Sequence, residues 1–257
     1  MLVNTEAWYN ITKAELNLLE SIDVQFFKSV LKAPKCTPTE MLYLEFGCIP
    51  FGHLIMKRRI LFFHYILNED KSSMLYRFLI AQMRSKKKTD WISQVQNDLE
   101  KLNLNQDMET FKNMKKSKLK IELDKLIKES IFKELNMKKA NHSKVKNVTH
   151  TKYEMQNYLK ANQLKITQEE AREIFKLRCR VTDVKANFKS KYENIDCENC
   201  KEEENQKHIL TCKISNKLEK DDLPEYDEIL KNNVKNQLQI AKKFIKNMKI
   251  RKKLNKI

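Results

Sequence analysis

The sequence has very little glycine and proline, with two glycines and four prolines in 257 residues. The turns of a β-sandwich or a β-barrel depend on these residue types, so their scarcity argues against both architectures. No apolar run approaches the length of a membrane span, and the first residues do not form a signal peptide. We therefore expect an all-α protein that is not secreted and has no membrane partner. Its expected location is the nucleus, or the nucleus and the cytoplasm.

Motifs that carry catalysis are also missing. The only adjacent aspartates, Asp221 and Asp222, do not resemble the Tyr-x-Asp-Asp strand that holds metal ions in reverse transcriptases. The chain has no Pro-Asp pair that could begin a restriction-like nuclease site, no glycine-rich phosphate loop and no nucleophile in a recognisable setting. We predict that the chain is not an enzyme by itself.

Positive charge, by contrast, is in large excess. The chain has 51 Lys and Arg residues against 34 Asp and Glu, a formal net charge of +17. Such an excess attracts polyanions, and nucleic acid is the commonest polyanionic partner of a basic chain; an anionic membrane surface is the alternative. From Lys231 onward the sequence contains ten basic residues and no acidic one, which is more than solubility requires. We favour RNA or DNA as the partner.

Apolar residues recur at helical spacing through most of the chain. Capping-box spacings at Thr12 and Thr167 each predict the start of a helix, the first covering 12–32. The segment 54–67 is apolar on almost every face, so we expect a buried helix in which His64 is part of the packed core. Further helices are expected over 41–44, 73–83, 90–102, 116–138 and 153–159.

The final segment has a heptad-like apolar pattern and predicts an amphipathic helix. The residues of this seam are Val234, Leu238, Ala241, Ile245 and Met248. We divide the chain into four consecutive regions. These are a helical region at 1–88, a charged helical middle region at 89–165, a helix with a zinc knuckle at 166–222, and a basic amphipathic helix at 223–257.

Four potential metal ligands lie close together in the third of these regions. Cys197, Cys200, His208 and Cys212 have the spacing Cys-x2-Cys-x7-His-x3-Cys. The first pair can reach one ion from a turn, and the second pair lies one helical turn apart. Four such ligands complete the coordination of Zn²⁺, which predicts a structural zinc knuckle without a position for reactive water. The alternative is free thiols and a surface histidine. The other cysteines are expected to be buried thiols: Cys36, Cys48 and Cys179.

Basic residues surround this motif and continue into the final helix. Such residues can offset the charge of a zinc site with three thiolates and can contact phosphates. Three aromatic residues, Phe188, Tyr192 and Tyr153, could stack on a base, although core packing is the commoner role of an aromatic side chain. The residues that we expect to contact nucleic acid are Lys185, Lys189, Lys201, Lys207, Lys213, Lys242, Lys246, Lys249 and Arg251.

The chain resembles the C-terminal end of reverse transcriptase polypeptides from non-LTR retrotransposons, in the part beyond the polymerase palm and thumb. Three blocks carry the resemblance. The first block contains residues 19–34, the stretch Thr37-Pro38-Thr39-Glu40-Met41-Leu42-Tyr43-Leu44-Glu45, and residues 58–67. The second contains Leu177-Arg178-Cys179-Arg180 and Val184-Lys185-Ala186-Asn187-Phe188. The third is the Cys-Cys-His-Cys motif with its basic tail.

The resemblance implies a segment that follows a polymerase domain and grips template RNA or target DNA through its knuckle. Some elements of this kind place an endonuclease after the knuckle, but the short Lys-rich tail here departs from that pattern. Two other hypotheses stay open. One is a zinc-stabilised protein-interaction module with a pairing helix, and the other is an enzyme that acts only when joined to an upstream polymerase domain.

Overall fold

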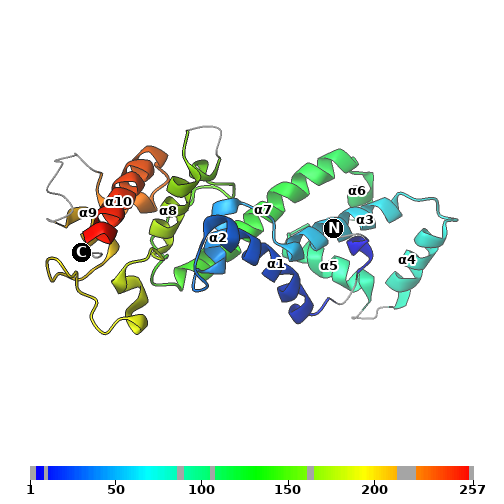
Figure 1. Ribbon diagram of the computed structural model, residues 1–257. Helices are drawn as coiled ribbons and strands as arrows, with labels where there is room; N and C mark the ends of the chain where they lie inside the picture. Colours follow the sequence, from blue (N-terminus) through cyan, green and yellow to red (C-terminus); the bar gives the residue numbers. More distant parts are fainter. Residues whose placement is uncertain are drawn as a thin grey trace. The chain divides into compact units, whose positions relative to one another are not determined.

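The prediction of an all-α protein is confirmed by the computed structural model (Figure 1). It describes residues 4–8, 11–85, 90–104, 108–160, 165–212 and 224–254. These residues form α-helices and short 3-10 helices, and within the described ranges the one β-type pairing is an isolated bridge between Asp196 and Glu203.

The first of two compact units contains Met1–Asp23 and Ile49–Glu134. Its elements are η1 (Thr5–Ala7), the first part of α1 (Lys13–Leu31), α3 (Phe51–Leu67), α4 (Met74–Ser85), α5 (Trp91–Lys101), α6 (Met108–Asn113) and most of α7 (Lys116–Ala140). The core is made by α3, α5 and α7, with Ile60, Val95 and Leu119 fully buried.

The second unit contains Val24–Cys48 and Leu135–Ile257. Its elements, besides the ends of α1 and α7, are α2 (Thr39–Phe46), η2 (Asn157–Leu159), α8 (Gln168–Cys179), η3 (Lys185–Lys191), α9 (Gln206–Thr211), η4 (Tyr226–Leu230) and α10 (Val234–Leu254). Helices α8 and α10 pack against each other, and α10 also contacts α9 (Figure 1). The core of this unit includes Leu44, Phe175 and Phe244.

Both capping boxes are confirmed. The Thr12 hydroxyl accepts a hydrogen bond from the Glu15 amide at 3.2 Å, and the Glu15 carboxylate accepts one from the Thr12 amide at 2.8 Å. Thr167 and Glu170 make the same reciprocal pair at the start of α8. Each box satisfies N–H groups that have no partner inside the helix, which is why both helices begin where the sequence predicts.

Other predictions were wrong. The expected helix over 153–159 is reduced to the single 3-10 turn Asn157–Leu159, and Tyr153 before it is held by a hydrogen bond from its hydroxyl to the Cys48 carbonyl. Local periodicity cannot reveal such a long-range bond.

The scattered cysteines were all predicted to be buried. Cys36 is exposed and Cys48 is half-buried, so that prediction was wrong for both, whereas Cys179 is buried as predicted. His64 is buried in α3, where its Nε2 lies 2.8 Å from the Met114 carbonyl oxygen.

A buried charged cluster in the second unit centres on Glu45 of α2. Its carboxylate accepts hydrogen bonds from the Arg178 guanidinium at 2.8 Å and from the Tyr158 hydroxyl at 2.7 Å, and it lies 3.1 Å from His150 Nε2. The side chains of Glu45, His150 and Arg178 have no solvent exposure. Burial raises the pKa of Glu45, but the charge of Arg178, together with hydrogen bonds from His150 and Arg178, outweighs it and lowers the pKa to about 2. We call these four residues the Glu45 cluster.

Burial also acts on the histidine of this cluster. It lowers the pKa of His150, and Glu45 offsets that shift only in part. The neutral imidazole is therefore the favoured form, which leaves Arg178 as the partner that neutralises Glu45. Arg178 also donates to the carbonyl oxygens of Ile229 and Lys231, at 2.9 and 3.0 Å. The cluster thus ties α2 and α8 to the segment before α10.

Substitution of Gly47 by alanine is expected to destabilise the second unit by about 2 kcal/mol or more. Gly47 ends α2 with φ of +63°, a left-handed conformation that costs an L-residue about 1–2 kcal/mol, and a Cβ there would meet the backbone of Glu154 and Met155. Thermal unfolding measures the change.

Gly52→Ala is the matched control. Gly52 is the second residue of α3 and is not left-handed, and a Cβ there would lie 3.1 Å from a flexible Leu16 methyl group, so Gly52→Ala should change stability by less than about 1 kcal/mol. Equal stability of the Gly47→Ala variant and the wild type would contradict the left-handed turn.

Candidate metal centre

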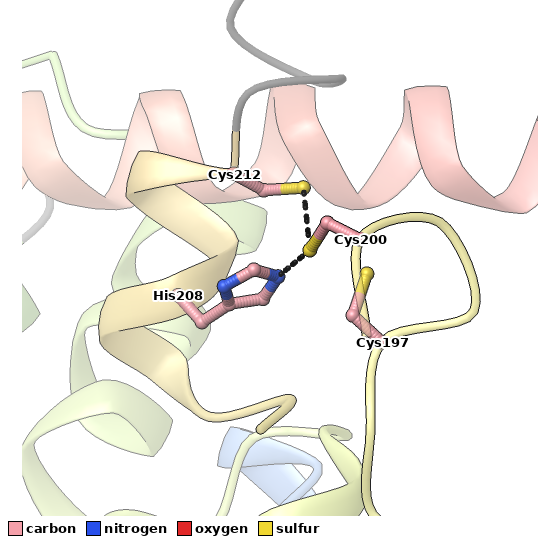
Figure 2. A group of neighbouring side chains, drawn as sticks. All are labelled: Cys197, Cys200, His208 and Cys212. Carbon is pink, nitrogen blue, oxygen red and sulfur yellow. Dashed lines mark hydrogen bonds between the residues drawn. The ribbon is translucent and has the colours of Figure 1, made fainter. Parts of the chain in front are cut away.

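A short loop after η3 positions the first two cysteines. The Cys197 amide donates to the Glu202 carbonyl at 2.7 Å, and the Lys201 amide donates to the Cys197 carbonyl at 2.9 Å. Lys201 has φ of +67°, so the chain reverses sharply just after Cys200. The isolated bridge between Asp196 and Glu203 closes the loop. This reversal brings the Cys197 and Cys200 side chains to the same side of the backbone (Figure 2).

The other two potential ligands come from α9. The Asn205 side chain caps this helix by accepting a hydrogen bond from the His208 amide at 2.8 Å. The Cys212 amide donates to the His208 carbonyl at 2.7 Å, so Cys212 follows one turn after His208 at the end of the helix. This is the arrangement that the His-x3-Cys spacing predicts.

The four side chains converge on one point (Figure 2). One ligand atom from each of Cys197, Cys200, His208 and Cys212 lies within 4.8 Å of the others. Cys200 Sγ lies 3.3 Å from His208 Nε2 and 3.9 Å from Cys212 Sγ. The group could hold one metal ion, and we call it the Cys3His group.

A carboxylate orients the histidine of this group. His208 Nδ1 lies 3.1 Å from the Glu202 carboxylate, which leaves Nε2 pointing at Cys200 (Figure 2). Burial lowers the pKa of His208, but the hydrogen bond with Cys197 and the charges of Cys212 and Cys197 outweigh burial, and the pKa is raised. Metal-binding histidines commonly donate their second N–H to a carboxylate in this way, because that bond fixes the ring.

The environment of Cys197 favours its thiolate. Burial raises the pKa of Cys197, but hydrogen bonds from His208 and from the Asn199 and Cys200 amides outweigh burial and bring the pKa to about 7. The Arg251 guanidinium, from α10, lies 3.8 Å from Cys197 Sγ. The thiolate is the form that binds a metal ion, so this environment suits a ligand.

The predicted nucleic-acid contacts around the loop have different environments. Lys201 and Lys207 are exposed. Lys189 is exposed and forms an ion pair with Glu203 at 3.3 Å. Lys185 is half-buried, and its Nζ donates to the Asp196 carbonyl and the Glu198 carboxylate, both at 3.1 Å. Lys185 therefore stabilises the loop that carries Cys197. Lys213 lies outside the described residues.

The predicted contacts in α10 divide into two sets. Lys242, Lys246 and Lys249 are exposed and line one groove of about 490 Å³ beside the start of α8. Arg251 instead is 6% exposed and faces the Cys3His group, so we remove it from the phosphate contacts.

The aromatic candidates for base stacking also differ in exposure. Tyr192 is 39% exposed, Phe188 is half-buried with Lys191 over its ring, and Tyr153 is buried. Tyr192 is thus the most accessible of the three.

Several residues that support the site were not predicted from the sequence. Glu202 orients His208, Glu204 forms a buried ion pair with Arg251, and Asn247 donates to the Ile209 carbonyl at 2.7 Å. Glu202 and Glu204 belong to a run of three glutamates that reads as a solvated surface. Only the conformation of the loop decides that Glu204 is buried while Glu202 stays exposed beside His208.

Comparisons with known proteins gave no match: no family model, no curated protein and no solved structure matches this chain. Among the described helices, none is both long enough and apolar enough to cross a bilayer. The fold and the site therefore define an all-α protein with a Cys3His group that could hold a metal ion.

Proposed function

We propose that the Cys3His group holds one Zn²⁺ ion in a structural role. Tetrahedral zinc with bonds of about 2.3 Å to sulfur and about 2.05 Å to nitrogen separates two sulfurs by about 3.8 Å and a sulfur from a nitrogen by about 3.6 Å. The distances from Cys200 to Cys212 and to His208, 3.9 and 3.3 Å, support this geometry. Four protein ligands leave no position for a reactive water, so the ion stabilises the loop rather than catalysing hydrolysis.

The second part of the proposal is that the chain binds RNA or DNA without catalysing a reaction. The supporting observation is the groove between α8 and α10, which is lined by Lys242, Lys246, Lys249 and Lys253. Glu170 and Glu169 pair with Lys242 at 3.7 Å and Lys249 at 3.3 Å across this groove. The lysines still outnumber the carboxylates, and the Lys249–Glu169 pair is exposed on both sides and contributes little, so a phosphate can replace that carboxylate as the partner.

The resemblance to retrotransposon reverse transcriptases supplies the proposed context. In that context the chain is the noncatalytic C-terminal part of a longer polypeptide and grips template RNA or target DNA after the polymerase domain. The zinc ion would hold the knuckle loop and α9 together beside α10. Catalysis would belong to the upstream domain.

A salt series tests the binding. Replacing Lys242, Lys246 and Lys249 by glutamine should weaken binding to single-stranded RNA and lower the slope of log K against log salt by about 2, since each lost phosphate contact contributes about 0.7. Fluorescence anisotropy at several salt concentrations measures the slope.

The control is a triple substitution with the same loss of charge on α7. Lys118, Lys120 and Lys125 are exposed and lie outside the groove. Their replacement by glutamine should change the slope by well under 1. If the two triple variants lower the slope equally, the groove is not the binding surface and only net charge matters.

A zinc-stabilised protein-interaction module is the second candidate. The observation that favours it is an exposed apolar face on α4, where Met74 is 87% and Phe78 is 63% exposed. In the proposed pairing seam of α10, Ala241 is buried in the chain's own second unit and the other four residues are partly buried. Association with a protein partner that does not weaken with salt would support this candidate over nucleic-acid binding.

A further inference from the structure

Arg251 is a buried cation next to the Cys3His group. It is 6% exposed and lies near the C-terminal end of α10. One of its terminal nitrogens donates both to Cys197 Sγ, at 3.8 Å, and to the Glu204 carboxylate. The other terminal nitrogen, NH1, is buried and has no hydrogen-bond partner among the residues that the structure describes.

An unpartnered guanidinium nitrogen is costly in a protein interior, because a charged group loses its hydration there. Glu204 neutralises the formal charge of Arg251 but leaves this nitrogen without an acceptor. Three thiolates and one neutral imidazole around a divalent ion carry a net charge of about −1. Cys197 lies against the terminal nitrogen that also contacts Glu204, so a loaded Cys3His group supplies further negative charge directly beside the buried guanidinium.

We propose that Arg251 is a positioning residue that couples metal binding to the docking of the C-terminal half of α10. This inference rests on the proposed metal site. The guanidinium stabilises the thiolates of the loaded group, and the loaded group in turn holds Arg251 and its helix in place. Asn247 strengthens the same attachment, since its amide donates to the Ile209 carbonyl of α9.

The first half of α10 is attached by other contacts. The Gln237 amide donates to the carbonyl oxygens of Ile229 and Lys231, and Phe244 is buried in the core. These contacts involve no ligand of the Cys3His group. Metal removal should therefore release residues 247–254 and leave 234–243 docked. The released half includes Lys249 and Lys253 of the proposed binding groove, so the metal ion would control part of that surface.

The experiment compares Arg251→Gln with Lys252→Gln in the full chain. Lys252 is the next residue, is exposed, and loses the same charge. Competition with a chromogenic chelator measures the Zn²⁺ affinity. We expect Arg251→Gln to weaken Zn²⁺ binding by about 10- to 100-fold, as substitutions of residues around metal ligands do, and Lys252→Gln to change it less than about 2-fold.

Amide hydrogen exchange on the same proteins measures whether the C-terminal half of α10 stays docked. In the wild type, removal of Zn²⁺ should speed exchange at 247–254 and leave 234–243 unchanged, and in Arg251→Gln the first segment should exchange rapidly even with Zn²⁺ present. Arg251→Lys keeps the charge but not the planar fork, so it should bind Zn²⁺ with intermediate affinity. It serves as the test variant if circular dichroism shows that Arg251→Gln loses its helices.

The outcomes separate this inference from the proposed function. A wild-type chain that binds no Zn²⁺ overturns both. One Zn²⁺ per wild-type chain, with unchanged affinity in both Arg251 variants or with exchange at 247–254 that does not depend on metal, overturns the role of Arg251 alone.

Discussion

Substitution of Cys200 by serine is expected to weaken Zn²⁺ binding by roughly 100- to 1,000-fold. Structural zinc in zinc-finger peptides binds with an apparent free energy of about 10–16 kcal/mol, so an equal share for one of four ligands is about 2.5–4 kcal/mol, or roughly 100- to 1,000-fold in affinity. Cys200 is a suitable position for this test, because its Sγ contacts two other potential ligands, His208 and Cys212. Native mass spectrometry measures the metal content, and competition with a chelator measures the affinity.

Cys36→Ser makes the same chemical change at an exposed thiol outside the Cys3His group. It should leave one Zn²⁺ per chain with wild-type affinity. If Cys200→Ser and Cys36→Ser bind Zn²⁺ with equal affinity, or if the wild type purifies and titrates without metal, the zinc assignment is wrong and the group consists of free thiols and a histidine.

Substitution of Arg178 by methionine is expected to destabilise the second unit by about 3–5 kcal/mol. It removes the cation that neutralises the fully buried Glu45 and leaves the Ile229 and Lys231 carbonyl oxygens without this donor. Breaking a buried ion pair by removing one partner leaves an uncompensated charge in the interior, which accounts for the size of the effect. Thermal unfolding followed by circular dichroism measures it.

Lys249→Met removes the cation of an exposed pair, since the side chains of Lys249 and Glu169 are each 63% exposed. It should change stability far less, because solvent screens such a pair. The double variant Glu45→Gln with Arg178→Met should be more stable than the sum of the single effects predicts, since it removes both charges. Strict additivity would contradict a direct interaction between the two side chains.

The pH dependence of stability gives a second measure of the same cluster. The folded pKa of Glu45, about 2, lies below its ordinary value of 4.5. Its carboxylate therefore contributes stability that is fully present above pH 4.5 and is lost as the pH falls toward 2. The lowered pKa of His150 acts in the same direction, with loss of stability as the pH falls below its ordinary value of 6.5. Glu45→Gln should remove the loss in the lower range and keep a loss below pH 6.5, because burial still lowers the pKa of His150 without Glu45.

Local signals predicted the helices well where a helix carries its own start signal. Thr12 and Thr167 cap their helices with residues three positions away, and Gly47 ends α2 in the left-handed conformation that glycine favours. These interactions lie within one turn of the chain, so the local sequence is enough to predict them. The segment at 153–159 had no such signal, and a contact with Cys48, far away in the sequence, decided its conformation.

The sequence by itself determined which four residues form the Cys3His group, because two short spacings bring each pair to one side of a turn and a helix. It also determined the all-α class, through the scarcity of turn residues and the helical period of the apolar ones. Only the tertiary structure decided that Arg251 turns inward to Cys197 while Lys249 turns outward, and that Glu45 meets Arg178. Helical period places a side chain on a face of its helix, but which face is buried depends on neighbours that are distant in the sequence.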